Sequence, residues 1–242
     1  MKETTIFQKT KSCLTAQNLK KLLLYLGGLL LIAVGANLAK LCGLGISPAT
    51  SIPRACEVIW GWTLGTSCQV VYLILMLLQI VVLRKNFKPI RLLSLLLTFV
   101  FGWMVDFTGT NTATFGHLMA GLPRPGSYPV QLLYLVISIL LIGVGVMLYV
   151  SPKWPPLPAE GLADALSTVT GKTFGDCKTL VDTSCIVIAL ILQLIFMGGL
   201  SSFTRSDVVV REGTVISALC VGQVVKLLNK KFGARVRGWM NS

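Results

Sequence analysis

A few charged and hydroxyl side chains interrupt the long apolar runs of this chain, and they are the residues best suited to bind a polar solute or an ion. Ionisable side chains at membrane depth are costly and usually face a protein interior or an aqueous path. Lys178 and Asp182 are four residues apart, so they can neutralise each other on one helix face. The predicted substrate-binding residues are Ser47, Thr50, Arg54, Glu160, Asp164, Lys178 and Asp182.

Catalytic chemistry is not indicated by the sequence. The one histidine, His117, has no nearby cluster of cysteines or carboxylates, and the GxSxG, HExxH, Walker A and dinucleotide-binding patterns are missing. The seven cysteines are scattered without a CxxC pair, which favours apolar packing over a disulfide framework or a metal site. We therefore predict no enzyme activity, no catalytic residues, no metal site and no cofactor.

The composition is that of a membrane protein. Hydrophobic residues make up 54% of the chain and charged residues 13%, about half the charged fraction of a soluble domain. The net charge of +13 is carried by residues that flank apolar segments, where basic residues set topology and contact anionic lipid. The lipid bilayer is therefore the expected partner, and nucleic acid is not.

Six apolar runs are close to the roughly 20 residues that cross about 30 Å of hydrocarbon. We expect spans at 22–41, 66–84, 90–108, 130–150, 178–199 and 212–229, the last being the weakest because it contains Gln223 and Lys226. The first run is too long for a signal-peptide core and has no small-x-small cleavage site after it, so it is predicted to be retained. These spans define a basic arm (1–21), a first three-helix unit (22–108), an outer loop (109–129), a second three-helix unit (130–229) and a basic tail (230–242).

The distribution of lysine and arginine predicts the orientation. With six spans, 17 of the 22 basic residues lie on one side of the membrane, in the two terminal segments and in the loops after the second and fourth spans. Because basic residues accumulate in cytoplasmic loops, both termini are expected in the cytoplasm.

The two units are predicted to be copies of one another. A single ungapped offset of 110 residues aligns Gly35 with Gly145, Pro48 with Pro158, Gly61 with Gly171, Thr63 with Thr173 and Gly65 with Gly175. Each unit has an odd number of spans, so the second copy enters the membrane from the opposite side. The expected fold is an all-α inverted repeat, an arrangement that is common in secondary transporters.

Each unit also contains a short segment between its first two spans. The segment starts at Pro48 or Pro158 and is too short to cross the membrane, at about 12 residues and near 18 Å. Ser47 before Pro48 is typical of a helix N-cap. Each short helix either enters the membrane, where its N-terminus would favour an anion, or lies flat at the interface.

Arg54 and Asp164 occupy equivalent positions at the offset of 110. They could pair with each other or face one solute, or each could lie in water at its own membrane face. The sequence leaves these alternatives open.

The second short segment carries a pattern that resembles the bacterial YczE/YitT-type family of membrane proteins. The pattern is Pro158-Ala159-Glu160-Gly161-Leu162, then Ala165-Leu166-Ser167, Thr170-Gly171, Gly175, Lys178 and Asp182, preceded in the first unit by Gly45-Ile46-Ser47-Pro48 and followed by Arg211-Glu212-Gly213-Thr214. Ala159 stands where that family usually has arginine, while the charge signs of Glu160, Lys178 and Asp182 are kept. The resemblance extends from about Leu29 to Gly222 and implies a bacterial inner-membrane protein, but it names no substrate.

The combined prediction is a multi-pass inner-membrane transporter of a small solute, with its site between the two units. One alternative is a substrate-binding membrane subunit that needs an energising partner. Another is an accessory or scaffold membrane protein with no transport of its own, and a membrane enzyme ranks below both. A homo-oligomer or a partner membrane protein is compatible with each of these functions.

Overall fold

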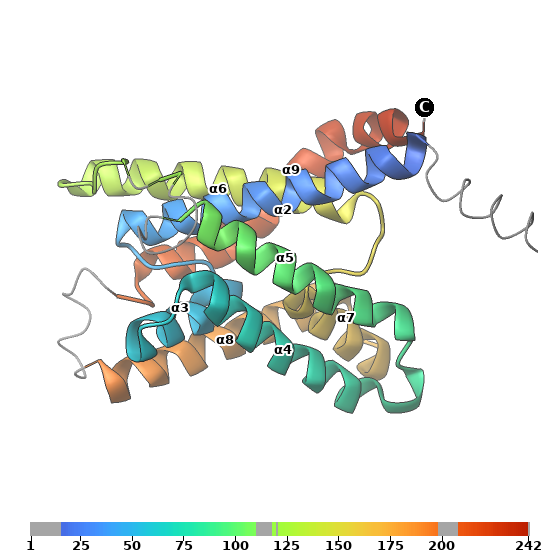
Figure 1. The fold of residues 1–242 in the computed structure, drawn as a ribbon, viewed down its shortest axis with the longest axis horizontal. Helices are drawn as coiled ribbons and strands as arrows, with labels where there is room; N and C mark the ends of the chain where they lie inside the picture. Colours follow the sequence, from blue (N-terminus) through green and yellow to red (C-terminus); the bar gives the residue numbers. More distant parts are fainter. Residues whose placement is uncertain (1–15, 110–117, 120, 198–207, 242) are drawn as a thin grey trace, which may run out of the picture.

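The computed structural model describes residues 16–109, 118–119, 121–197 and 208–241, and within these ranges the chain is helical without strands. Figure 1 shows its order of elements. They are α2 (Ala16–Cys42), α3 (Pro48–Trp60), α4 (Leu64–Leu83), η1 (Arg84–Asn86), η2 (Pro89–Leu92), α5 (Leu93–Phe107), α6 (Tyr128–Val150), α7 (Pro158–Thr170), α8 (Phe174–Phe196) and α9 (Glu212–Asn241).

Five helical stretches are long and apolar enough to cross a membrane. They are Asn18–Cys42, Leu64–Asn86, Pro89–Phe107, Tyr128–Val150 and Phe174–Phe196, which coincide with the first five predicted spans. The sixth predicted span lies in α9, which does not reach the same apolar character and runs unbroken across the boundary predicted at residue 229. Lys226, Lys230 and Lys231 on α9 reduce that character, and the count of six spans stays a prediction.

The second half of the chain repeats the local structure of the first. The short helices α3 and α7 are both 13 residues long and start 110 residues apart. Each ends at a glycine in the left-handed region, Gly61 at φ 71° and Gly171 at φ 70°, where other residues would be strained. The next helix in each half is capped by a threonine, Thr63 or Thr173, whose hydroxyl accepts a backbone N–H three residues on. The offset found in the sequence therefore recurs in helix bounds and caps.

Helices α2 and α6 make the most extensive contact of the fold, lie side by side in Figure 1 and run antiparallel. A Cβ atom added to Gly35 would meet the Ser138 carbonyl oxygen at 3.1 Å, and one added to Gly145 would meet the Gly28 carbonyl oxygen at 2.7 Å. The offset of 110 relates these two contacts, because residue 35 corresponds to residue 145 and residue 138 corresponds to residue 28. The contacts at the crossing are thus exchanged in pairs at the offset of 110.

The packing of the short helices follows the same pattern. Helix α3 packs on α8 and α7 packs on α4, so each short helix contacts a long helix of the other half. In Figure 1 both short helices lie between the α2–α6 pair and the long helices α4 and α8. In the first turn of α3, Ser51 Oγ donates to the carbonyl of Cys185, which is at the middle of α8. The N-terminal end of α3 therefore reaches the interior of the molecule.

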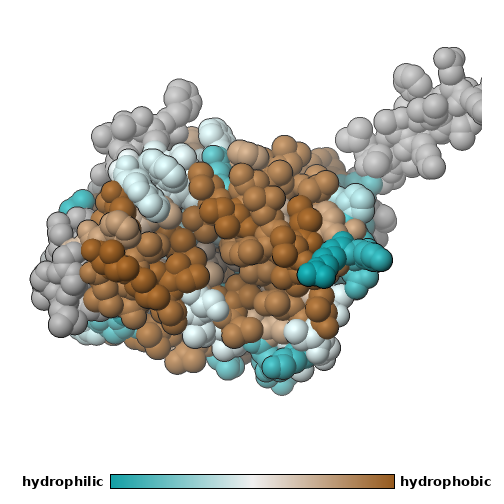
Figure 2. Space-filling model, turned by 90° about the horizontal axis from the view of Figure 1, so that it is seen from below, coloured by the Kyte–Doolittle hydropathy of each residue, from teal (hydrophilic) through white to brown (hydrophobic). Residues whose placement is uncertain are grey.

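The surface carries the apolar residues that a bilayer would cover. Exposed leucine, isoleucine and valine side chains follow one face of each long helix, such as Ile74, Leu77 and Val81 on α4 and Ile188, Ile191 and Ile195 on α8. Figure 2 shows hydrophobic side chains over most of one face, with hydrophilic residues mainly toward its edges. The first and last turns of the described chain lie together, because Lys20 Nζ is 5.4 Å from the centre of the Trp239 ring.

Candidate functional site

The second half of the chain brings three of the predicted site residues into one ion cluster, which we call the α7–α8 cluster: Glu160, Lys178 and Asp182. Lys178 Nζ lies 2.7 Å from Asp182 Oδ1 and 3.6 Å from Glu160 Oε1. Lys178 and Asp182 are one turn apart on α8, and Glu160 is in the first turn of α7. The three side chains are 18–25% exposed, so the cluster lies mostly inside the protein.

Aromatic side chains from α2 and α6 lie close to this cluster. The rings of Tyr25 and Tyr149 meet edge to face at 5.6 Å, and Trp154 lies 5.6 Å from Tyr25 on the other side. The Tyr25 hydroxyl donates to the Pro155 carbonyl at 2.8 Å, which holds the chain that leads into α7. Tyr149 is fully buried, and its hydroxyl lies near Glu160. Helices α2, α6 and α8 and the first turn of α7 therefore contribute side chains to one region of the molecule.

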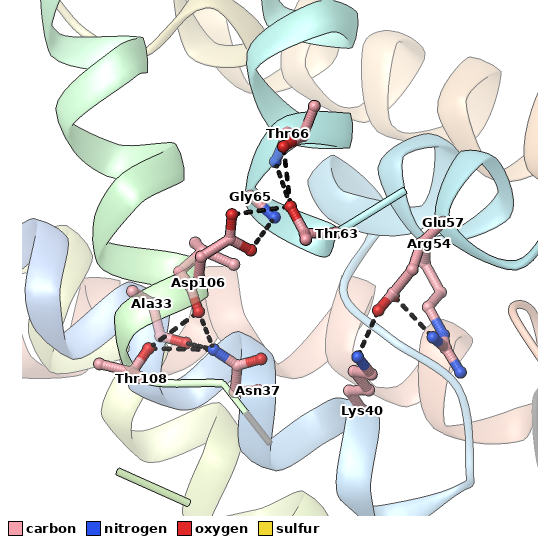
Figure 3. Close-up of polar contacts among 11 residues, drawn as sticks. Ala33, Asn37, Lys40, Arg54, Glu57, Thr63, Gly65, Thr66, Asp106 and Thr108 are labelled. Atoms are coloured by element: carbon pink, nitrogen blue, oxygen red, sulfur yellow. Dashed lines mark hydrogen bonds and ion pairs between the residues drawn. The ribbon is translucent and has the colours of Figure 1, made fainter. Parts of the chain in front are cut away.

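The first half of the chain has an ion cluster of its own, the α2–α3 cluster: Lys40, Arg54 and Glu57. Glu57 Oε1 is paired with Lys40, and Glu57 Oε2 lies 2.6 Å from Arg54 Nη1. Figure 3 shows Glu57 between the two basic side chains, with Lys40 reaching it from α2. Glu57 was missed by the sequence analysis, although its position three residues after Arg54 on a buried helix face was a usable signal.

The structure does not bring Arg54 and Asp164 to one place. Arg54 pairs with Glu57 on its own helix, whereas Asp164 pairs with Arg91 of η2 and is 46% exposed. The two positions correspond at the offset of 110. However, the Arg54 guanidinium and the Asp164 carboxylate each pair with a different residue nearby. Of the alternatives that the sequence left open, a direct pair between Arg54 and Asp164 is not formed, and each residue has an ion pair of its own.

Ser47 and Thr50 lie at the start of α3 and contact each other. Their hydroxyl oxygens are 2.9 Å apart, and the Thr50 hydroxyl also lies 3.1 Å from the Ser47 carbonyl oxygen. Ser47 has the extended backbone expected of an N-cap, but its side chain bonds to Thr50 rather than to a free backbone N–H. These two residues belong to the first half and are separate from the α7–α8 cluster in sequence.

Asp106 has a structural role that the sequence did not reveal. Its carboxylate accepts the Gly65 backbone N–H at 2.8 Å and the Thr63 hydroxyl at 2.7 Å, as Figure 3 shows. A carboxylate at the first turn of α4 satisfies free N–H groups and interacts favourably with the helix dipole. Asp106 thus fastens α5 to the start of α4.

The described residues include no group of three or more His, Cys, Asp or Glu side chains placed to hold a metal ion. His117 lies outside these residues. Five cysteines, Cys42, Cys56, Cys68, Cys177 and Cys185, are buried thiols, and Cys220 is an exposed one.

The fold and its ion clusters define a multi-pass helical membrane protein with charged side chains held inside it. The chain belongs to DUF6198, a family of unknown function, whose model matches residues 19–230. It is 27% identical to the uncharacterized protein YyaS of Bacillus subtilis (strain 168) over 169 residues, which cover 69% of this chain and 78% of YyaS. No solved structure matches the chain. The comparisons do not name the YczE/YitT-type family, so that resemblance stays a prediction.

Proposed function

We propose that this protein is a secondary transporter of a small solute, built as an inverted repeat of two three-helix units. The proposal depends mainly on how the short helices pack. Each short helix carries a residue of a largely buried ion cluster and also contacts a long helix of the other half. Transporters of this architecture hold their substrates at the interface of the repeats, near short or broken helices.

The antiparallel crossing of α2 and α6 supports this arrangement. Exchanged contacts between antiparallel copies are what a pseudo-two-fold axis in the membrane plane produces, and that axis would pass between α2 and α6 at their crossing. Under this proposal α9 is the sixth span, and α3 and α7 are half-membrane helices that enter from opposite sides. Both termini then lie on the same side, the cytoplasmic one, as the contact between Lys20 and Trp239 allows.

The buried charges support a polar substrate or a coupling ion. Charged side chains inside a membrane protein are expensive to keep and commonly mark a substrate or ion path. The α7–α8 cluster lies where α7 meets α8 and α4, so movement of one half against the other changes its surroundings. The suggested mechanism is a rocking of the two units around this cluster, with Glu160, Lys178 and Asp182 as substrate-binding residues.

The experiment that tests the proposal begins with purified protein and a library of small metabolites. A ligand at a hundredfold excess over its Kd stabilises the native state by about 2.7 kcal/mol, which a thermal-shift measurement detects. The shift should be lost in Asp182→Asn, which alters the α7–α8 cluster, and kept in Asp164→Asn, which alters a more exposed pair. Uptake of the same ligand into proteoliposomes then measures transport.

The outcomes separate the proposed transporter from its rivals. Binding without uptake would indicate a substrate-binding subunit, which needs a partner membrane protein. Folded protein that binds nothing in the library, but is recovered with a partner on gentle extraction, would indicate an accessory or scaffold protein. Reporter tags at the two ends test the bacterial inner-membrane orientation, since the proposal expects both on the cytoplasmic side.

A further inference from the structure

Two buried oxygen atoms beside the α7–α8 cluster lack a partner. Across the part of the chain that the structure describes, neither Tyr149 Oη nor Glu160 Oε2 has a hydrogen-bond partner of standard geometry. Tyr149 is only 1% exposed, and its hydroxyl lies near the Glu160 carboxylate. Buried polar atoms are nearly always satisfied, so we expect these two neighbouring oxygens to share a hydrogen bond with each other.

The α7–α8 cluster has one more negative group than positive groups. Two carboxylates, Glu160 and Asp182, share the single ammonium of Lys178, which lies nearer Asp182 at 2.7 Å than Glu160 at 3.6 Å. Glu160 is therefore the less compensated of the two acids. An uncompensated charge away from water is costly, and the usual relief is neutralisation.

The other groups facing Glu160 do not supply the missing positive charge. They are Tyr25 on α2, Tyr72 on α4, Tyr149 on α6, and Cys185 beside Lys178 and Asp182 on α8. Arg91 of η2 lies near α7 but is paired with Asp164. Lys178 is thus the one basic side chain in this set.

We propose that Glu160 is a proton-binding site. It takes one proton onto Oε2, and the resulting O–H group donates a hydrogen bond to Tyr149 Oη. The proton comes from a hydronium ion in the aqueous phase: the O–H bond of that ion breaks as the Glu160 O–H bond forms, and a water molecule is left. A hydrogen bond between the two oxygens forms in either ionisation state of Glu160, but only the proton neutralises the surplus charge, and a metal ion would need several further oxygen ligands. The inference rests on the proposed function, because in a transporter this proton would be the coupling ion.

The α2–α3 cluster provides a matched comparison. Glu57 is also a buried glutamate on a short helix, but both its oxygens are occupied by ion pairs, with Lys40 and with Arg54. Its charge is already compensated by these two basic side chains, so its substitution should leave the proposed proton site unchanged. Glu57→Gln is therefore a control for the removal of a buried glutamate.

The experiment is infrared difference spectroscopy of the full-length protein in lipid, compared between neutral and mildly acidic buffer without any solute. A protonated carboxyl group gives a C=O stretching band that carboxylates do not have. We expect the band in the wild type, its loss in Glu160→Gln and its retention in Glu57→Gln. In Tyr149→Phe, a small change that keeps the ring, the band should remain but move in frequency because the acid loses its hydrogen-bond partner.

Three results would overturn the inference: no acid band in the wild type, a band that persists undiminished in Glu160→Gln, or a band lost only in Asp182→Asn. If Glu160→Gln does not fold, the frequency shift in Tyr149→Phe decides, and an unmoved band refutes the contact. Failure here is distinguishable from failure of the transport proposal. A protein that shows the band but moves no solute keeps the proton site, and one that moves solute without the band is driven in another way.

Discussion

The crossing of α2 and α6 should tolerate no side chain at Gly28. A Cβ atom there would lie 2.6 Å from the Tyr149 backbone nitrogen and 2.7 Å from the Gly145 carbonyl oxygen. Ordinary contacts start at 3.4 Å, so the two backbones would have to separate by about 0.8 Å. Overpacking of this kind costs about 1–3 kcal/mol, and more if the exchanged contact at Gly145 is lost with it.

Gly27→Ala is the matched control, because a Cβ atom at Gly27 meets nothing within 4 Å. Both variants gain the same helix propensity, about 1 kcal/mol, so their difference isolates the crossing. We expect Gly28→Ala to melt below Gly27→Ala, by roughly 2–4 °C for each kcal/mol in a chain of this size.

A thiol-reactive dye measures the melting in detergent, since five cysteines are buried in the fold and become reactive on unfolding. Equal melting temperatures for Gly28→Ala and Gly27→Ala would refute the close crossing and, with it, the exchanged contacts.

Three further substitutions test the polar contacts by the same thermal measurement. Glu57→Gln should destabilise the protein by about 1–3 kcal/mol, because it removes the charge that two largely buried basic side chains share; a loss below 1 kcal/mol would mean that the cluster is solvated. Asp164→Asn should cost less than about 1 kcal/mol, since that ion pair is half exposed, and a large loss would contradict its surface position. Asp106→Asn should cost about 1–2 kcal/mol through the start of α4, and more than Asp176→Asn at the exposed start of α8; the reverse order would argue against the fastening role of Asp106.

The long helices, and the recurrence of a short helix at an offset of 110, could be predicted because their signals are local. Apolar runs long enough to span a bilayer specify the long helices, and Pro48, Gly61 and Thr63 with their copies specify where the short helices begin, end and give way to the next helix. Those positions need particular backbone conformations, so they persist at an offset of 110 when apolar residues have drifted. Helix α9 was less predictable because lysines and apolar residues alternate along it.

The partners of the charged residues could not be predicted, because they depend on which helices meet. Lys178 and Asp182 are on one helix, so their spacing revealed the pair. Lys40 lies 17 positions before Glu57, and Arg91 lies 73 positions before Asp164. The offset of 110 made a pair between Arg54 and Asp164 one open alternative, but positions related by an offset share an environment only where the surrounding side chains also correspond. Glu57, for example, corresponds to Ser167.

The exchange of short helices also affects how the chain is made. Ser51 on α3 bonds to Cys185 on α8, 134 residues further along, so α3 can pack on α4 but cannot complete its packing while the first half emerges from the ribosome. The first half must wait in the membrane, with its buried ion cluster incompletely covered, until the second half has been inserted. Assembly is therefore a late event governed by synthesis time, and the unfinished first half is the form of the chain most exposed to quality-control proteases.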